Sequence, residues 1–140
     1  MPVETRTIRI PTKGFNDVLD LTDEIRFSLE STQLKSGVVT IFVPGATAGI
    51  TTMEFESGCV SDLKDTFEKM VPHSGHYAHN ARWGDGNGFS HVRAAILGAS
   101  LQVPFSNKRL LTGTWQQIVL VDFDNRPRRR EVILQFMGDS

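Results

Sequence analysis

The sequence Val38-Val39-Thr40-Ile41-Phe42-Val43 carries the strongest strand signal in the chain. β-Branched residues dominate it and both of its alternating faces are apolar, which is typical of a strand buried in the middle of a sheet. Pro44 and Gly45 then break the pattern. A second strand is expected over residues 49–55, and we expect it to pair with the first strand as a hairpin.

Outward from this strand, the spacing of apolar residues predicts the other elements of a fold with both helices and strands. Three helices are expected. The first begins at Thr22 and fades near Gly37, the second spans residues 59–71, and the third spans residues 90–97. The expected strands cover residues 3–10, 15–21, 101–105, 109–112, 116–123 and 130–137. The order ββαββααβββ, with one extra short strand, indicates an α+β fold in which a mixed, mostly antiparallel sheet packs with two to three helices. We expect one domain of residues 1–140.

Composition narrows the classes of function. Fifteen basic and sixteen acidic residues create no general field for nucleic acid or an acidic membrane. A single cysteine, Cys59, excludes an internal disulfide framework and a Cys-rich zinc site. No apolar run approaches the ~18 residues needed to span a bilayer, and no signal region is evident, so we expect a cytoplasmic protein. One basic cluster, Arg126 with Arg128, Arg129 and Arg130, is interpreted as a solvated turn rather than a partner site.

All four histidines, His73, His76, His79 and His91, fall within nineteen residues. Two imidazoles brought together by a loop can hold a divalent ion, and Asp85 could add an oxygen ligand. The alternative is that the histidines are ordinary surface residues of a polar loop. We favour that alternative for His73 and His76, and the functional interpretation for His79 and His91.

The glycines of Gly84-Asp85-Gly86-Asn87-Gly88 precede an expected helix. Glycine permits backbone angles that form a concave nest of N–H groups, and a helix start adds positive potential, so a phosphate could bind there. The run matches neither a Walker loop nor GxGxxG, and it could also be only a turn. Because it has few apolar anchors, residues 80–89 are expected to be mobile.

Thr114, Trp115 and Gln116 combine hydrogen-bonding groups with a large aromatic face. This combination suits the lining of a heteroaromatic ring, although a tryptophan beside a strand could equally cap the core. Glu54 and Glu56 share one face of their expected strand. They could complete a metal shell, but we favour a solvent-facing position for both.

Several ordered segments resemble the YjbQ-like family: residues 43–52, 84–87, 90–92, 97–100 and 104–116. The likeness extends over most of the chain. It implies a homotrimer in which strands pack against helices and ligand sites lie near the subunit junctions. The outward faces expected for Val103, Ile118 and Leu120 also motivate the homotrimer prediction.

Some members of the family have a weak thiamine-phosphate synthase activity, which joins a pyrimidine pyrophosphate to a thiazole phosphate. By this resemblance, His79 and His91 would bind a divalent metal ion (Mg or Zn) or act as acid and base. Asp85 would be catalytic beside them. The phosphorylated metabolite would contact Gly84, Gly86 and Asn87, with Thr114, Trp115 and Gln116 lining its ring.

The chain departs from the family at Gly45, where many relatives carry histidine. A third metal ligand would therefore come from Glu54, Asp85, water or an anion. The alternative function is a non-catalytic trimeric protein that binds a metal ion or a phosphorylated metabolite.

Overall fold

The strands form two antiparallel sheets in the computed structural model, which describes residues 2–140. The five-stranded sheet has the order β1 (Val3–Thr12), β8 (Arg128–Asp139), β3 (Ser36–Phe42), β5 (Ser100–Ser106) and β6 (Arg109–Leu110). The three-stranded sheet has the order β2 (Asp17–Asp20), β7 (Gln117–Asp122) and β4 (Ala48–Met53). This arrangement confirms the predicted α+β class with a mostly antiparallel sheet.

Four helices accompany the sheets: α1 (Thr22–Glu30), α2 (Ser57–Met70), α3 (Ala78–Trp83) and α4 (Gly88–Leu97). Ile25 and Leu29, four residues apart, form the buried face of α1. Glu56 caps α2, because its carboxylate accepts hydrogen bonds from the N–H groups of Gly58 and Cys59. None of these helices, in the part of the chain that the structure describes, is both long and apolar enough to cross a membrane.

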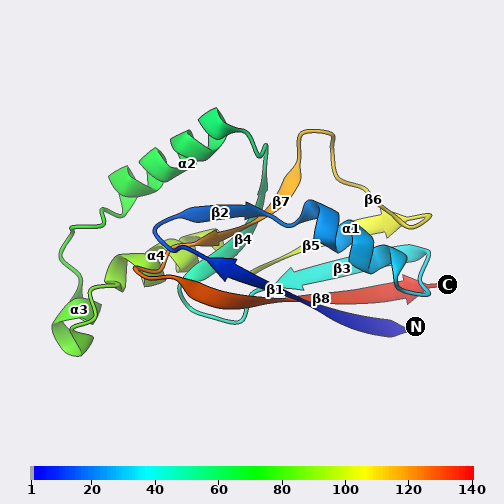
Figure 1. Ribbon diagram of the computed structural model, residues 1–140, viewed down its shortest axis with the longest axis horizontal. Helices are drawn as coiled ribbons and strands as arrows, with labels where there is room; N and C mark the ends of the chain where they lie inside the picture. Colours follow the sequence, from blue (N-terminus) through cyan, green and yellow to red (C-terminus); the bar gives the residue numbers. More distant parts are fainter. Residues whose placement is uncertain (1) are drawn as a thin grey trace.

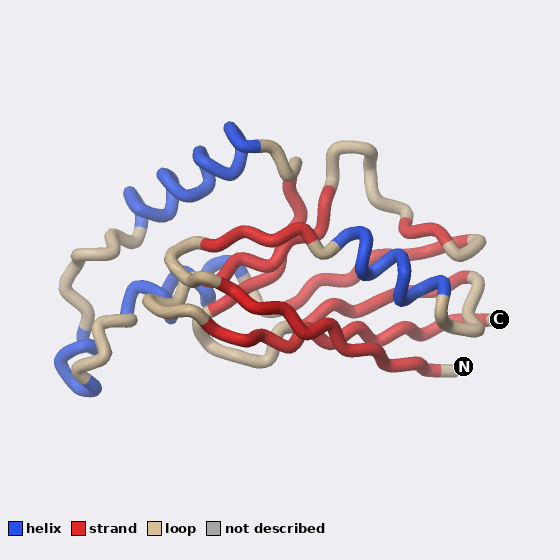
Figure 2. The backbone as a smooth tube through the Cα atoms, viewed as in Figure 1, coloured by secondary structure: helices blue, strands red, loops and turns tan. Residues whose placement is uncertain are grey.

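Strand β7 is buried on both faces and joins the two halves of the core. Ile118 and Leu120 point toward the five-stranded sheet and α1. Val119 and Val121 point the other way, where they pack with Phe67 of α2. The alternation follows from the pleat of a strand. Figure 1 shows α2 and α4 toward one end of the molecule with α3 beyond them, and Figure 2 shows α1 beside the strands at the other end.

The predicted pairing of strands was partly wrong. β3 does lie in the middle of its sheet, between β8 and β5. Its expected hairpin partner β4 instead pairs with β7, so that Ile50 lies opposite Leu120. The short helix α3 was not predicted. Val103, Ile118 and Leu120 are core residues, not outward-facing ones, with exposed fractions of 5%, 0% and 0%.

Candidate functional site

The candidate site lies where α3, α4 and the turn between β7 and β8 meet. Gly84 ends α3 with a φ of 72°, and Gly86 has a φ of 70°. Both values lie in the left-handed region that favours glycine. Gly88 is needed for another reason, because a Cβ atom there would lie 2.6 Å from the Cβ of Tyr77. The glycines therefore let the two helices meet at their N-terminal ends.

His79 and His91 are brought together by this meeting of helices. His79 belongs to the first turn of α3 and His91 to the first turn of α4. Their ring centroids lie 4.4 Å apart, with the ring planes 39° from parallel. Both side chains are half-buried. The proximity expected from the sequence is present in the fold, while the roles assigned to the two rings stay predictions.

The Asp85 carboxylate faces the Nδ1 atom of His79. Its Oδ1 atom lies 3.4 Å from His79 Nδ1, within ion-pair range. The same Nδ1 atom is shielded from solvent and makes no hydrogen bond of good geometry within residues 2–140. A shift of a few tenths of an ångström would convert this contact into a hydrogen bond.

The buried amide of Asn87 lies between the carboxylates of Asp85 and Asp124. With its nitrogen toward Asp85, it donates to the two carboxylate oxygens at 2.9 Å and 3.2 Å. With the nitrogen toward Asp124, it donates to Oδ1 at 3.3 Å. We assign the first orientation, because it makes two hydrogen bonds at shorter distances in place of one at 3.3 Å. Asn87 then holds the carboxylate that faces His79.

Asp124 anchors this arrangement to the strands. Burial raises the pKa of its carboxyl, but hydrogen bonds from the Asn125 N–H and from Arg128 outweigh that effect and lower the pKa. The Arg128 Nε atom lies 2.7 Å from Asp124 Oδ2. Thr47, in the loop before β4, donates to the same oxygen at 3.0 Å. An ionised Asp124 therefore ties the β7–β8 turn to the loop before β4.

Arg130 and Asp122 form a second buried ion pair beneath the site. Arg130 donates from Nε and Nη2 to the two oxygens of Asp122, each at 2.8 Å, and from Nη2 to Thr47 at 2.8 Å. Thr12 also donates to Asp122. Arg130 is only 9% exposed. The interpretation of the arginine cluster as a solvated turn is therefore wrong for Arg130, and for the partly buried Arg128, and right for Arg126 and Arg129, which are exposed.

A groove of about 290 Å³ opens beside His91. Its walls are small residues of α4 and of the loop before β4, and they include Gly45. A Cβ atom on Gly45 would lie 3.1 Å from Arg130 Nη1. The groove thus brings His91 close to the position where the sequence departs from its family pattern. Its small walls leave room for a ligand to approach the imidazole.

The residues of the predicted aromatic wall lie elsewhere. Thr114, Trp115 and Gln116 precede Gln117, the first residue of β7, whereas Asp122 is its last residue and the turn at Asp124 follows it. At ~3.3 Å per residue this strand separates the two places by roughly 20 Å. One copy of the chain therefore does not bring the wall and the His79–His91 pair together.

The other expected site residues are also dispersed. His73 packs edge-on against Phe89, with 4.8 Å between the ring centroids, and His76 is exposed. Glu54 is exposed, as expected, and Glu56 caps α2. Among residues 2–140 there is no group of three His, Cys, Asp or Glu side chains arranged to hold a metal ion.

Arg93 is an important buried residue that the sequence did not indicate. It is 1% exposed, and it donates to the carbonyl oxygen of Val71 and to Glu68 Oε2, the latter at 2.8 Å. The hydrogen bond from Arg93 is the largest cause that lowers the pKa of the Glu68 carboxyl. An arginine in an amphipathic helix normally suggests a solvated position, so the sequence carried no signal for this one. Its contacts fix α4 against the end of α2.

Comparison with known proteins finds relatives that all belong to one family. The sequence model described as UPF0047 protein YjbQ-like matches residues 6–139. A UPF0047 protein of Methanothermobacter thermautotrophicus is 34% identical over 138 residues, covering 99% of this chain and 94% of the relative. UPF0047 protein YugU of Bacillus subtilis is 34% identical over 135 residues, covering 95% and 98%.

Solved structures show the same fold. A crystal structure from Sulfolobus solfataricus P2, described as a YbjQ-like protein of unknown function, superimposes with a TM-score of 0.93 at 30% identity, covering 99% of each chain. A hypothetical protein from Aeropyrum pernix K1 gives a TM-score of 0.90 at 29% identity, covering 97% of this chain and 99% of that one.

Proposed function

We propose, for a chain that belongs to the UPF0047 YjbQ-like family, that the His79–His91 site binds the phosphate end of a small metabolite and supports weak thiamine-phosphate synthase-type transfer. In this reaction the bond from a pyrimidine methylene carbon to pyrophosphate breaks, and a bond to a thiazole nitrogen forms. The observation that supports the proposal is the contact of the two imidazoles, 4.4 Å between centroids, with Asp85 beside one of them.

Asp85 and Asn87 have positioning roles in this proposal. Asn87 holds the Asp85 carboxylate, which faces His79 Nδ1 and favours the tautomer with its proton on that nitrogen. His79 Nε2 is then left to accept a proton or bind a cation. Asp85 thus acts through His79 and not as a direct phosphate contact, which two like charges would oppose.

The main-chain N–H groups of Gly86 and Asn87, which follow Gly84 in the loop, are the proposed phosphate contacts. The two glycines have left-handed φ values, as anion nests do. The N–H groups of Gly84 and Gly88 do not contribute, because they donate to the main-chain carbonyl and to the side-chain Oδ1 of Asn80, each at 2.8 Å. The nest is therefore smaller than the sequence alone indicated, and the imidazoles must supply part of the affinity.

A divalent metal ion fits this site in part. Two imidazoles that share an ion each bring a nitrogen to about 2 Å from it, and rings this close are compatible with that requirement. Imidazole favours Zn over Mg. When bound, the ion would neutralise charge on the departing pyrophosphate. The described residues offer no third protein ligand in place, so water or the phosphate itself would complete the shell.

The role of Trp115 in the same reaction requires a second copy of the chain. Because the wall of Thr114, Trp115 and Gln116 and the histidine pair lie at opposite ends of β7, one ligand cannot contact both within a copy. We therefore propose a homotrimer in which the wall of one copy faces the histidines of its neighbour. Light scattering at micromolar concentration tests this, and a monomer would contradict it.

A non-catalytic trimeric protein that binds a metal ion or a phosphorylated metabolite is the second candidate. The groove of about 290 Å³ beside His91 favours it, because binding needs only room beside the imidazole and no group that acts on the ligand. Both candidates are tested by incubating the purified protein with the two thiamine precursors and Mg²⁺. The transferase is supported if turnover exceeds background, is abolished in the His91→Ala variant and is retained in the His73→Ala variant. Ligand-induced thermal stabilisation without product, lost in His91→Ala but kept in His73→Ala, supports the binding protein. If neither turnover nor stabilisation is observed, both candidates are rejected.

A further inference from the structure

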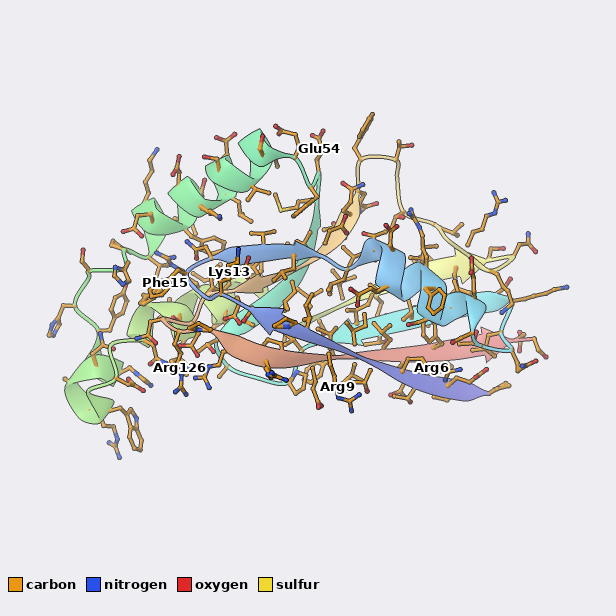
Figure 3. The ribbon with its side chains drawn as sticks, in the orientation of Figure 1. Arg6, Arg9, Lys13, Phe15, Glu54 and Arg126 are labelled. Carbon is orange, nitrogen blue, oxygen red and sulfur yellow. The ribbon has the colours of Figure 1, made fainter. Side chains whose placement is uncertain are left out.

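A groove of about 440 Å³ lies at the end of β7 opposite to the histidines. It is bounded by the start of α1, the end of β4 and the loop between β6 and β7. Figure 3 shows Glu54 at the tip of β4, far from Lys13, Phe15 and Arg126, which lie at the histidine end of the molecule. Within one copy the groove is therefore separate from the histidine pair, although it shares Thr114 and Trp115 with the wall discussed above.

Two aromatic residues line the groove with much of their surface in solvent. Trp115 is 73% exposed and Phe55 is 44% exposed. Such large apolar side chains are usually covered by a partner or a ligand when they gather at one place. Their backbone positions are fixed by Gln117, whose Oε1 accepts from the Phe55 N–H at 2.9 Å while its Nε2 donates to the Thr114 carbonyl at 3.2 Å. The two walls are thus held by one side chain.

The polar lining of the groove is acidic. Four carboxylates border it, from Asp20, Asp23, Glu54 and Glu56, against one guanidinium, from Arg26. Arg26 is paired with Asp23 at 3.4 Å, so it does not neutralise the other three.

The four carboxylates differ in their availability to a ligand. Asp20 accepts from the Thr22 N–H, and Glu56 accepts from two N–H groups at the start of α2. Those hydrogen bonds lower the pKa of Glu56, with the bond from Gly58 as the largest cause, and keep it ionised. Glu54 makes no side-chain hydrogen bond or ion pair within residues 2–140. It is the carboxylate that remains free to meet a ligand.

We propose that this groove binds an organic cation, a positively charged amine or quaternary ammonium group carried on an apolar or aromatic body. An aromatic face attracts a cation through its quadrupole, and the surrounding carboxylates add a negative field. The same field disfavours a phosphate. The rigid connection through Gln117 reduces the conformational entropy lost on binding. The proposal goes beyond the function proposed above, because it assigns to the Trp115 groove a class of ligand whose binding needs neither the histidines nor turnover.

Benzyltrimethylammonium, which carries no phosphate, is a suitable probe. The chain has two tryptophans, so the Trp83→Phe variant leaves Trp115 as the only one. Its indole N–H resonance and its fluorescence then report on the groove alone. Benzyl alcohol supplies the same ring without charge, and phenylacetate supplies it with negative charge, all at constant ionic strength.

We expect a saturable response to the cation that is much weaker with benzyl alcohol and absent with phenylacetate. Glu54→Gln should weaken the cation about twofold to fivefold, the usual effect of one exposed charge. Glu24→Gln is the matched control, because Glu24 is an exposed acid in the first turn of α1 that does not line the groove.

Three results would overturn the proposal. The first is that the cation gives no saturable response. The second is that benzyl alcohol binds as tightly as the cation. The third is that Glu24→Gln weakens binding of the cation as much as Glu54→Gln does, which would indicate only a general negative field. None of these measurements involves His79, His91 or a phosphate, so a failure here is distinguishable from a failure of the proposed transfer reaction, which the turnover and light-scattering assays test.

Discussion

Replacing Arg130 with leucine should destabilise the protein strongly. The change removes two charge-assisted hydrogen bonds to Asp122 and one hydrogen bond to Thr47. It leaves Asp122, which is 0% exposed, as a buried charge without its partner. Removing one partner of a buried ion pair costs about 3–5 kcal/mol, and two charge-assisted bonds at roughly 1.5–3 kcal/mol each agree with that range.

Thermal and urea unfolding followed by circular dichroism measure this cost. A chain of 140 residues has an unfolding entropy of about 0.3 kcal/mol per kelvin, so the melting temperature should fall by roughly 10–17 °C. The urea midpoint should fall while the slope stays unchanged. Arg129→Leu is the matched control, because Arg129 is the exposed neighbour on the same strand. It should change the free energy of unfolding by less than about 0.5 kcal/mol.

A double variant separates the ion pair from simple packing. Replacing Arg130 and Asp122 together with methionine and leucine removes both charges, so it should recover a large part of the lost stability. A loss below about 1 kcal/mol for Arg130→Leu would refute the reasoning, since an exposed arginine in a turn has an effect of that size. The guanidinium would then be solvated, as the sequence had suggested for this cluster.

Three further predictions concern the site and its surroundings. His91→Ala should abolish ligand-induced thermal stabilisation and change the free energy of unfolding by only about 1 kcal/mol, whereas His73→Ala should keep the ligand response; equal effects would contradict a specific site. The lowered pKa of Asp124 contributes stability at pH values above its unfolded pKa, and that stability is lost as the pH falls through the folded pKa. Urea unfolding in steps below pH 4 should therefore show the wild type losing its advantage over Asp124→Asn, and a constant difference would count against the assignment. Amide hydrogen exchange should be faster at residues 80–89 than in β7, because none of residues 80–86 is buried and Phe89 is the one buried apolar side chain of the segment, and equal protection would show that prediction to be wrong.

The sequence predicted the existence of most elements because their signals are local. The β-branched run at residues 38–43 and the spacing of Ile25 and Leu29 depend only on neighbours along the chain. The partner of β4 could not be inferred in the same way. Pairing of β4 with β7 joins residues far apart in the chain, such as Ile50 and Leu120, which are 70 positions apart. The closeness in sequence that suggested a hairpin between β3 and β4 carried no information about this pairing. The six residues of α3 are too few, and too polar, to show a helical period.

Only part of the candidate site could be predicted from the sequence, for a related reason. The glycines and histidines of residues 79–91 stand out by residue type, and the fold brings His79, Asp85, Asn87 and His91 together. The charged residues beneath them do not stand out, because an arginine or an aspartate is usually solvated. Arg130 and Asp122 become buried only because each strand supplies the partner of the other. Nothing in either local sequence indicates that partner.

Strand β7 connects the two regions to which we assign ligands. Its middle residues are buried on both faces, so it can hardly shift without disturbing both halves of the core. At one end Asp122 and Asp124 hold Arg130, Arg128 and Thr47 in place beneath the histidines. At the other end Gln117 holds both walls of the Trp115 groove. A rigid strand with polar anchors at each end keeps both sites preorganised, and it also keeps them apart within one copy. Any reaction that needs the imidazoles and Trp115 on one ligand must therefore take place between copies of the chain.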